Sequence, residues 1–362
     1  MKIVVCAGIF PPDIGGPATY SRVLADELTK RGHKVSVVTY ADSLKDDRRY
    51  NFAVQRVLRG KIKPLHYFRY FRAVKQLGKN ADLLYAQDPV SAGYPTYLAS
   101  RFLKKPFVVK VTGDYSWEQA CFRGTCSVSI DDFQKQRSYP FYIKKIRDFQ
   151  IQVCREAKLV ITPSYYLKTL VRGWGVNGER VRVIYNAVEK ASEIDRNQAR
   201  QDLSFAPDDF FVLSAGRDVP WKGFAVLKAV FNDLAKENPK MKFKILNSAS
   251  RETILRHLKA ADVFVLNTAY EGFPHIILEA MIMGTPVVTT EVCGNPEIVQ
   301  DGKNGILVGF NNRQQIAEAI NKLYLDLPLR QALSRNARSS AEKFSLENMI
   351  NQTEEILKSC AF

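Results

Sequence analysis

Short apolar segments alternate with longer amphipathic segments along almost the whole chain, and this alternation constrains the fold more than any other feature. Residues 2–7 predict a buried strand, and a helix that opens with Pro17 and closes at Gly32 follows it. Residues 35–39 predict the next strand. Strands and helices in turn are typical of a parallel sheet that helices cover on both faces. The sequence therefore predicts an α/β protein with doubly wound sheets.

The length of 362 residues suits two domains better than one. Further strands are predicted at residues 83–86, 107–111, 159–162, 181–184, 211–215, 243–246, 263–266, 287–289 and 306–308. A polar run that ends at Asp209 separates the two halves. We expect an N-terminal domain over residues 1–187 and a C-terminal domain over residues 188–344. A last helix at about 345–362 could pack back on the first domain.

The composition argues against membrane-spanning, secreted and zinc-binding proteins. No segment approaches the eighteen apolar residues that a membrane span needs. The apolar start of the chain meets Pro11 and Pro12 too soon for a signal peptide. The six cysteines are scattered, without the His/Cys cluster that a zinc site requires. We predict reduced thiols in a cytoplasmic protein, with a redox pair of Cys121 and Cys126 as an alternative.

Positive charge is concentrated in the first half of the chain. The net charge is +17 over residues 1–185 and −1 over residues 186–362. Two stretches, 54–80 and 135–147, mix Lys and Arg with Tyr and Phe, and the first has eight basic residues and no acid. This mixture suits an anionic membrane surface. It would also suit nucleic acid, but no nucleic-acid module is recognisable, so we predict peripheral attachment to a membrane, with a solvated basic face as the alternative.

The segment 271–288 holds two carboxylates with seven residues between them. Pro274 suits the first position of a helix, and Gly284 suits the position just past its end. The free N–H groups and the positive dipole at such a helix start favour a phosphate. Glu271, just before the helix, can accept hydrogen bonds from sugar hydroxyls, and Glu279, among apolar residues, would find a partner in a ribose diol. The alternative is a helix-start acid and a surface acid.

This segment resembles the donor-sugar motif of retaining glycosyltransferases of the two-domain GT-B type, group 1 or family 4. The resemblance implies two Rossmann-like domains that face an interdomain cleft, where open α/β sheets bind ligands at the carboxyl ends of their strands. It also implies that the donor contacts the two acids and the residues of the loop and helix between them. These residues are Gly272, Phe273, Pro274 and Ile277.

A cationic loop follows the predicted strand at 211–215. Arg217 can hold a diphosphate by its planar guanidinium, and Lys222 can do so as a point charge. On their own, two such residues would more often be surface charges. The loop resembles the phosphate-binding turn of the same family, which assigns these cations to the donor diphosphate and to stabilisation of the leaving group.

A pair of glycines, Gly15 and Gly16, precedes the first helix, which opens with Pro17. Glycine lets the backbone approach a ligand closely, and the helix start favours phosphate. A Gly-Gly pair alone would be a plain turn. The family uses this loop against the donor diphosphate or the acceptor.

Residues 105–118 depart from the family pattern. Many members carry a His near the end of this strand, and here Thr112, Gly113 and Asp114 occupy its place. Asp114 is the candidate to receive the acceptor proton or to orient the acceptor hydroxyl, and Glu118 is a weaker alternative. Asp114 could equally be a helix cap.

A second departure lies between Leu246 and Arg251, where about one β-α unit of the family pattern is missing. That unit lies close to the nucleotide base in the family, so the base is left open. The sequence also lacks the Asp-x-Asp motif with which transferases of the other main fold hold a divalent metal. We therefore predict no metal and no cofactor, with a nucleotide-diphosphate sugar as the donor substrate.

Taken with these residues, the resemblance implies a metal-independent retaining hexosyltransferase. Its acceptor would be the hydroxyl of a lipid-linked, polysaccharide or other cell-envelope glycan at the inner face of the membrane. Catalytic roles fall to Asp114, Arg217, Lys222 and Glu271. The alternatives are a sugar-nucleotide epimerase or phosphorylase of the same fold, and a non-catalytic sugar-binding protein.

Overall fold

The computed structural model describes residues 1–13, 15–44, 47–189, 194–247 and 249–361. The chain divides into two compact units, and each is described by itself. The first unit comprises Met1–Tyr185 and Glu347–Phe362, and the second comprises Asn186–Leu346. Within the described ranges, none of the helices combines the length and the apolar character that crossing a membrane requires. All six cysteines are free thiols.

The described part of the first unit holds a seven-stranded parallel sheet in the order β3-β2-β1-β4-β5-β6-β7. Its strands are β1 (Lys2–Ala7), β2 (Lys34–Ala41), β3 (Ala53–Leu58), β4 (Leu83–Ala86), β5 (Phe107–Lys110), β6 (Leu159–Thr162) and β7 (Val181–Val183). The central strands β4 and β5 are buried throughout, as expected for strands covered on both faces. The predicted doubly wound sheet is therefore confirmed in this unit.

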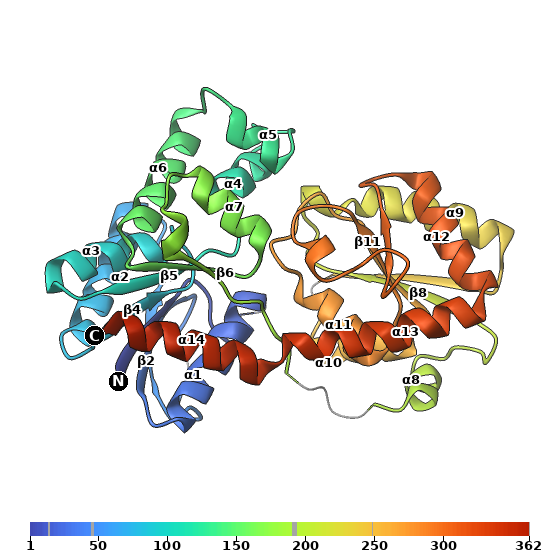
Figure 1. The fold of residues 1–362 in the computed structure, drawn as a ribbon, viewed down its shortest axis with the longest axis horizontal. Coiled ribbons are helices and arrows are strands. Elements are labelled where there is room, and N and C mark those ends of the chain that lie inside the picture. Colours follow the sequence, from blue (N-terminus) through green and yellow to red (C-terminus); the bar gives the residue numbers. More distant parts are fainter. Residues whose placement is uncertain (14, 45–46, 190–193, 248, 362) are drawn as a thin grey trace. The chain divides into compact units, whose positions relative to one another are not determined.

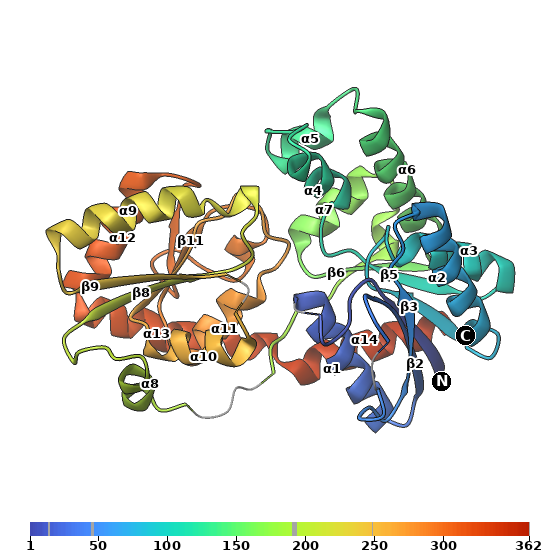
Figure 2. The ribbon, with the colours of Figure 1, turned by 180° about the vertical axis from the view of Figure 1, so that it is seen from behind.

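Helices cover both faces of this sheet. The helices of the unit are α1 (Gly16–Lys30), α2 (Lys63–Gly78), α3 (Gly93–Leu103), α4 (Tyr115–Phe122), α5 (Ile130–Lys135), α6 (Phe141–Glu156), α7 (Tyr165–Gly173) and α14 (Leu346–Ala361). Helices α1 and α14 lie on one face, and α2, α3 and α6 lie on the other (Figures 1 and 2). The sequence pattern missed β3, α2, α3, α4 and α5. Strand β3 was missed because Gln55 and Arg56 interrupt the apolar run of a strand that lies at the sheet edge.

The last helix, α14, is attached to the first unit by charged groups. Glu354 contacts His33 at 2.9 Å and Arg31 at 2.7 Å, and within α14 itself it pairs with Lys358 at 2.5 Å. At the end of the helix, Lys158 donates a hydrogen bond to the carbonyl oxygen of Cys360 at 3.0 Å. The tail of the chain thus returns to the fold that begins at its N-terminus.

The charged groups around Glu354 predict a pH-dependent stability of the fold. The hydrogen bond from Lys358, with those from His33 and Arg31, lowers the pKa of Glu354 from 4.5 to about 2. A depressed carboxyl pKa contributes stability above pH 4.5, and this contribution is lost as the pH falls towards 2. We expect Glu354→Gln to lower the free energy of unfolding by about 1 kcal/mol at pH 7, since solvent screens these pairs.

Urea unfolding at a series of pH values measures this effect. The difference between Glu354→Gln and the wild type should shrink as the pH falls below 4.5. The exposed neighbour Glu355, changed to Gln, is the control and should leave stability unchanged. A deficit of Glu354→Gln that stays constant with pH would contradict the prediction.

The described part of the second unit holds a five-stranded parallel sheet in the order β12-β11-β10-β8-β9. Its strands are β8 (Phe210–Ala215), β9 (Met241–Leu246), β10 (Val263–Leu266), β11 (Val287–Thr290) and β12 (Ile306–Val308). All five were predicted to within a residue or two. The strand β9 lies at one edge, and α10 begins only five positions after its last residue, which is the short connection noted in the sequence.

The helices of this unit are α8 (Arg196–Asp202), α9 (Phe224–Glu237), α10 (Arg251–Ala260), α11 (His275–Met283), α12 (Arg313–Leu325) and α13 (Leu327–Ala341). Helices α9 and α12 lie on one face of the sheet, and α10, α11 and α13 lie on the other (Figures 1 and 2). Apolar residues of β8, α9 and α12, including Val212, Leu227 and Ile320, form a continuous core on the first face.

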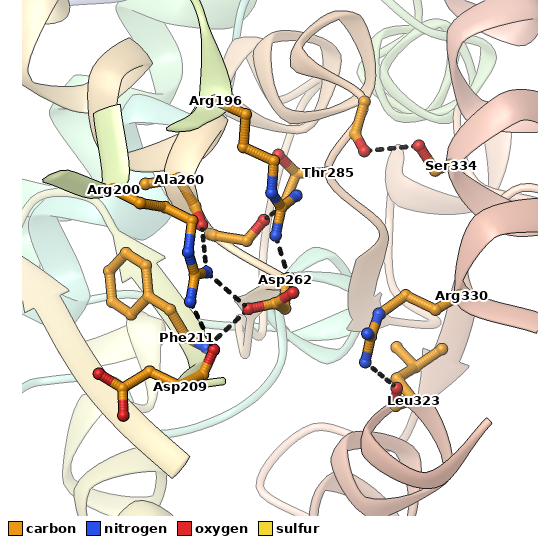
Figure 3. A network of polar contacts seen from close by, with 12 residues as sticks. Arg196, Arg200, Asp209, Phe211, Ala260, Asp262, Thr285, Leu323, Arg330 and Ser334 are labelled. Atoms are coloured by element: carbon orange, nitrogen blue, oxygen red, sulfur yellow. Dashed lines mark hydrogen bonds and ion pairs between the residues drawn. The ribbon is translucent and has the colours of Figure 1, made fainter. Parts of the chain in front are cut away.

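A buried carboxylate joins α8 to the sheet (Figure 3). Asp262 accepts hydrogen bonds from Arg196 at 2.8 Å, Arg200 at 3.2 Å and the backbone N–H of Phe211 at 2.9 Å. Arg200 also donates to the carbonyl oxygens of Asp209 and Ala260, and it is only 9% exposed. The charge of Asp262 is therefore needed to balance a buried guanidinium.

We expect Asp262→Ala to lower the free energy of unfolding by about 3 kcal/mol, because the Arg200 guanidinium would lose its only charged partner among the described residues. Urea unfolding measures the change. The matched control is Asp202→Ala, since the pair of Asp202 with Arg256 is partly exposed and should contribute under about 1 kcal/mol. If both variants lost the same free energy of unfolding, burial of the Asp262 network would not determine how much it contributes to stability.

Candidate functional site

The candidate residues of the second unit gather at one edge of its sheet. All five strands are parallel, so their carboxyl ends lie at the same edge. Arg217 and Lys222 follow β8, Glu271 follows β10, and Arg251 follows β9. This edge is where open α/β sheets bind ligands.

Lys222 and Glu271 form an ion pair with each other. Their side chains are only 12% and 16% exposed. Lys222 ends a short 3-10 turn, and Gly223 follows it with φ +52°. A Cβ at Gly223 would lie 2.2 Å from Nδ2 of Asn267, so only glycine lets this turn pack against the loop after β10. The structure thus brings together one predicted cation and one predicted acid.

Arg217 is different from Lys222. It is exposed on the loop after Gly216, and the described part of the chain contains no ion pair or hydrogen bond of its side chain. Its guanidinium is therefore available to an anion at this edge.

The loop after β11 lies directly against the acidic motif. The backbone N–H of Gly294 donates to the carbonyl oxygen of Glu271 at 3.0 Å. A Cβ at Gly294 would lie 2.2 Å from the carbonyl oxygen of Gly272, so the approach requires glycine. Asn295, fully buried, donates to Thr289 and Thr290 and holds this loop in place. Sequence reasoning missed this support, although the Gly294-Asn295-Pro296 run a few residues after the strand could have indicated a tight turn.

Helix α11 begins one residue later than predicted. Pro274 is the N-cap, with φ −77° and ψ 116°, and the helix runs from His275 to Met283, with Gly284 as its C-cap at φ +76°. The side chains of Phe273 and Ile277 are 4% and 0% exposed. Both therefore belong to the core, and the backbone N–H groups at the helix start can meet a ligand instead.

The sequence predicts a ribose diol as the partner of Glu279, but in the structure a side chain of the protein pairs with it. Arg251 contacts Glu279 at 2.9 Å and Glu189 at 3.2 Å. Burial raises the pKa of Glu279, and Arg251 opposes this shift. The sequence pattern did not indicate this Arg, because it lies 28 positions away at the start of α10.

Asp114 caps helix α4 in the first unit. It is fully buried, and its Oδ1 accepts hydrogen bonds from the backbone N–H groups of Ser116 and Trp117 at 2.9 and 3.1 Å. Gln150 donates to the same oxygen at 3.0 Å, and Gln134 donates to Oδ2 at 2.8 Å. These contacts use the lone pairs that a proton acceptor would need, so they support the capping alternative over the catalytic one.

Gly15 and Gly16 lie at the start of α1, as the sequence predicted. Gly15 is the N-cap, with φ +156°, and its carbonyl oxygen accepts from Ala18 and Thr19 at 3.1 Å. The glycines and Asp114 belong to the first unit. In the described ranges, the ion pair between two candidate residues is that of Lys222 with Glu271, whereas Glu279 pairs with Arg251, which was not a candidate. No group of three His, Cys, Asp or Glu side chains suited to a metal ion occurs in the described ranges.

Two family models match the chain. The model described as "Glycosyl transferases group 1" matches residues 242–340, and the model described as "Glycosyltransferase Family 4" matches residues 14–191. A glycosyltransferase of Methanocaldococcus jannaschii, itself uncharacterized, is 26% identical over 99% of this chain and 98% of its own length.

Solved glycosyltransferase structures share the fold. Sucrose-phosphate synthase of Thermosynechococcus elongatus has a TM-score of 0.79 at 18% identity and covers 99% of this chain and 98% of its own. HepE of Anabaena, in complex with UDP and glucose, has a TM-score of 0.77 at 23% identity, with 99% and 100% covered. WaaG, a glycosyltransferase involved in lipopolysaccharide biosynthesis, has a TM-score of 0.72 at 18% identity, with 99% of each chain covered. These likenesses establish the two-domain GT-B fold.

Proposed function

Because the chain belongs to the group 1 glycosyltransferases of the GT-B fold, we propose that it transfers a hexose-type sugar from a nucleotide-diphosphate sugar to an acceptor hydroxyl, with retention at the anomeric carbon. The observation that carries this proposal is the contact between Lys222 and Glu271 at the carboxyl edge of the second sheet, next to the start of α11. One cation for a phosphate and one acid for sugar hydroxyls stand side by side there.

In the proposed reaction, the bond between the anomeric carbon and the phosphate oxygen breaks while the acceptor oxygen attacks from the same face. The acceptor proton passes to the leaving phosphate, so no protein base is needed. Arg217, Lys222 and the backbone N–H groups at the start of α11 stabilise the charge that develops on the diphosphate. Glu271 holds the sugar hydroxyls, and a second acid, Glu279, holds the ribose.

Two ion pairs would rearrange when the donor binds. Lys222 would exchange part of its contact with Glu271 for the diphosphate, which frees Glu271 oxygens for the sugar. In the same way, the ribose would share Glu279 with Arg251. The pairs thus hold the two acids in fixed orientations before the donor arrives.

The test is a panel of nucleotide-diphosphate sugars in a thermal-shift assay, followed by transfer assays with the donors that bind. A donor at 100 times its Kd stabilises the folded protein by about 2.7 kcal/mol. The HepE structure contains UDP and glucose, so UDP-glucose is the first donor to test. We propose that transfer continues in EDTA, because the cations of the protein neutralise the diphosphate. Stabilisation by none of the donors, or donor loss without acceptor, would refute the transferase proposal.

For the acceptor, we propose a lipid-linked or cell-envelope glycan at the cytoplasmic face of a membrane. The basic stretches 54–80 and 135–147 support this, and WaaG offers a precedent in lipopolysaccharide biosynthesis. The two stretches differ in the structure. Lys135 and Lys144 are paired with Asp132 and Asp148, which weakens the field of the second stretch.

We therefore expect the protein to bind vesicles with anionic lipids at low salt and to leave them as salt rises, since about 1 kcal/mol per basic residue is screened. Co-sedimentation with vesicles of phosphatidylglycerol and phosphatidylcholine, across a salt series, measures this. Neutral vesicles are the control. Equal binding to both vesicle types at low salt would contradict the prediction.

A further inference from the structure

An open groove of about 830 Å³ lies between the edge strand β3 and helix α2 of the first unit. The face of α2 towards this groove repeats at helical spacing, with Phe68 followed by Arg72, Lys75 and Lys79. The opposite face of the helix is buried, with Tyr70 at 0% exposure. The groove is therefore built on a well-anchored helix.

The groove is lined by cations and by no acid. Arg56, on the strand side, is paired with Asp47 at 2.7 Å. Arg72 and Lys79 are exposed, and the described residues hold no ion pair of either. An unbalanced positive row of this kind attracts phosphate or carboxylate groups.

Apolar side chains stand at the same groove. Phe68 is 53% exposed, and Leu58, at the end of β3, is 42% exposed. Phe71 also lines it and contacts Phe102 of α3, which is 60% exposed, edge to face at 6.3 Å. Lys75 lies 3.7 Å from the centroid of that Phe102 ring. Exposed aromatic groups beside unpaired cations mark a binding surface for something that is both apolar and anionic.

We propose that this groove binds one anionic membrane lipid, with the phosphate at Arg72 and Lys79 and the first part of a hydrocarbon chain along Phe68 and Leu58. Charge complementarity favours this occupant, and the apolar side chains favour it over a purely polar anion such as an acidic peptide. The proposal is independent of sugar transfer, because the residues that line the groove belong to the first unit and include none of the residues proposed to act in transfer. The proposal replaces a general attraction between the basic stretches and the membrane by one defined lipid-binding site.

The experiment measures calorimetric binding of decyl phosphate and octyl phosphate, each below the concentration at which it forms micelles, with inorganic phosphate as the headgroup alone. If the chain is buried, each added methylene should tighten binding about fourfold, so decyl phosphate should bind about 15-fold more tightly than octyl phosphate. Phe68→Ser should reduce that ratio and leave the binding of inorganic phosphate unchanged.

A double variant, Arg72→Gln with Lys79→Gln, should weaken decyl phosphate about 25-fold. The matched control, Lys228→Gln with Lys236→Gln on the exposed side of α9, changes the net charge equally and should alter binding less than twofold. Unchanged thermal unfolding verifies that both variants are folded. Binding that ignores chain length, an equal loss in the control, or tighter binding of a polyglutamate peptide would overturn the proposal.

Discussion

Replacing Glu271 by alanine is expected to lower the rate of sugar transfer at saturating donor by about 10³-fold, while the protein stays folded. Among the described residues, Lys222 is the only ion-pair partner of this carboxylate, and its loss would remove the group that we propose binds the sugar hydroxyls. The loop itself is held by backbone contacts, including the hydrogen bond from Gly294 to the carbonyl oxygen of residue 271, which alanine retains. The fold should therefore survive the change.

Transfer kinetics with the donor identified by thermal shift, together with thermal unfolding, measure both parts of this expectation. The matched control is Glu291→Ala, an exposed acid that follows β11 at the same edge of the sheet. The control should retain transfer within about twofold. Wild-type turnover in the Glu271→Ala variant would show that this carboxylate has no role in the reaction. If that variant does not fold, Glu271→Gln, which keeps the size of the side chain, takes its place.

Removing both Arg217 and Lys222 as alanines is expected to lower turnover by about 10⁴-fold, since each cation that stabilises the leaving diphosphate contributes about 10²-fold. The loss should fall mainly on kcat, because negative charge grows on the diphosphate as the bond to the sugar breaks. The single variants should differ in stability. Arg217 is exposed and its removal should cost little, whereas removal of Lys222 leaves Glu271 without its ion partner.

The control for this pair is Lys228→Ala, an exposed cation on α9 of the same unit. Single-turnover kinetics separate donor binding from bond cleavage. A double variant that loses only donor affinity, with kcat unchanged, would show that the two cations bind the diphosphate without stabilising its departure.

Most strands of the two sheets could be predicted because they are short, mainly apolar runs bounded by glycine or polar residues. The strands β4, β5 and β10 are buried along their whole length, so nearly every position carries the pattern. The edge strand β3 was missed for the opposite reason. Its exposed positions do not need apolar residues, so the sequence pattern there is that of a basic stretch.

The candidate site was predictable only in part. Glu271 and Glu279 lie close together in the chain, on either side of a predicted helix start. The structure has α11 at this place, between the loop and Gly284. Asp114 shows the limit of such reasoning, because a carboxylate after a strand can cap a helix or face a ligand. The donors that decide between these roles, Gln134 and Gln150, come from other helices.

By itself, the sequence determined most strands of the two sheets, the cationic loop after β8 and the acidic motif after β10, because each of these depends on residues close together in the chain. The tertiary structure alone decided that Lys222 meets Glu271, that Arg251 meets Glu279, and that β3 and α2 enclose a basic groove. These contacts join residues that lie tens of positions apart. Their energies depend on distances and burial, which exist only once the strands have paired and the helices have packed.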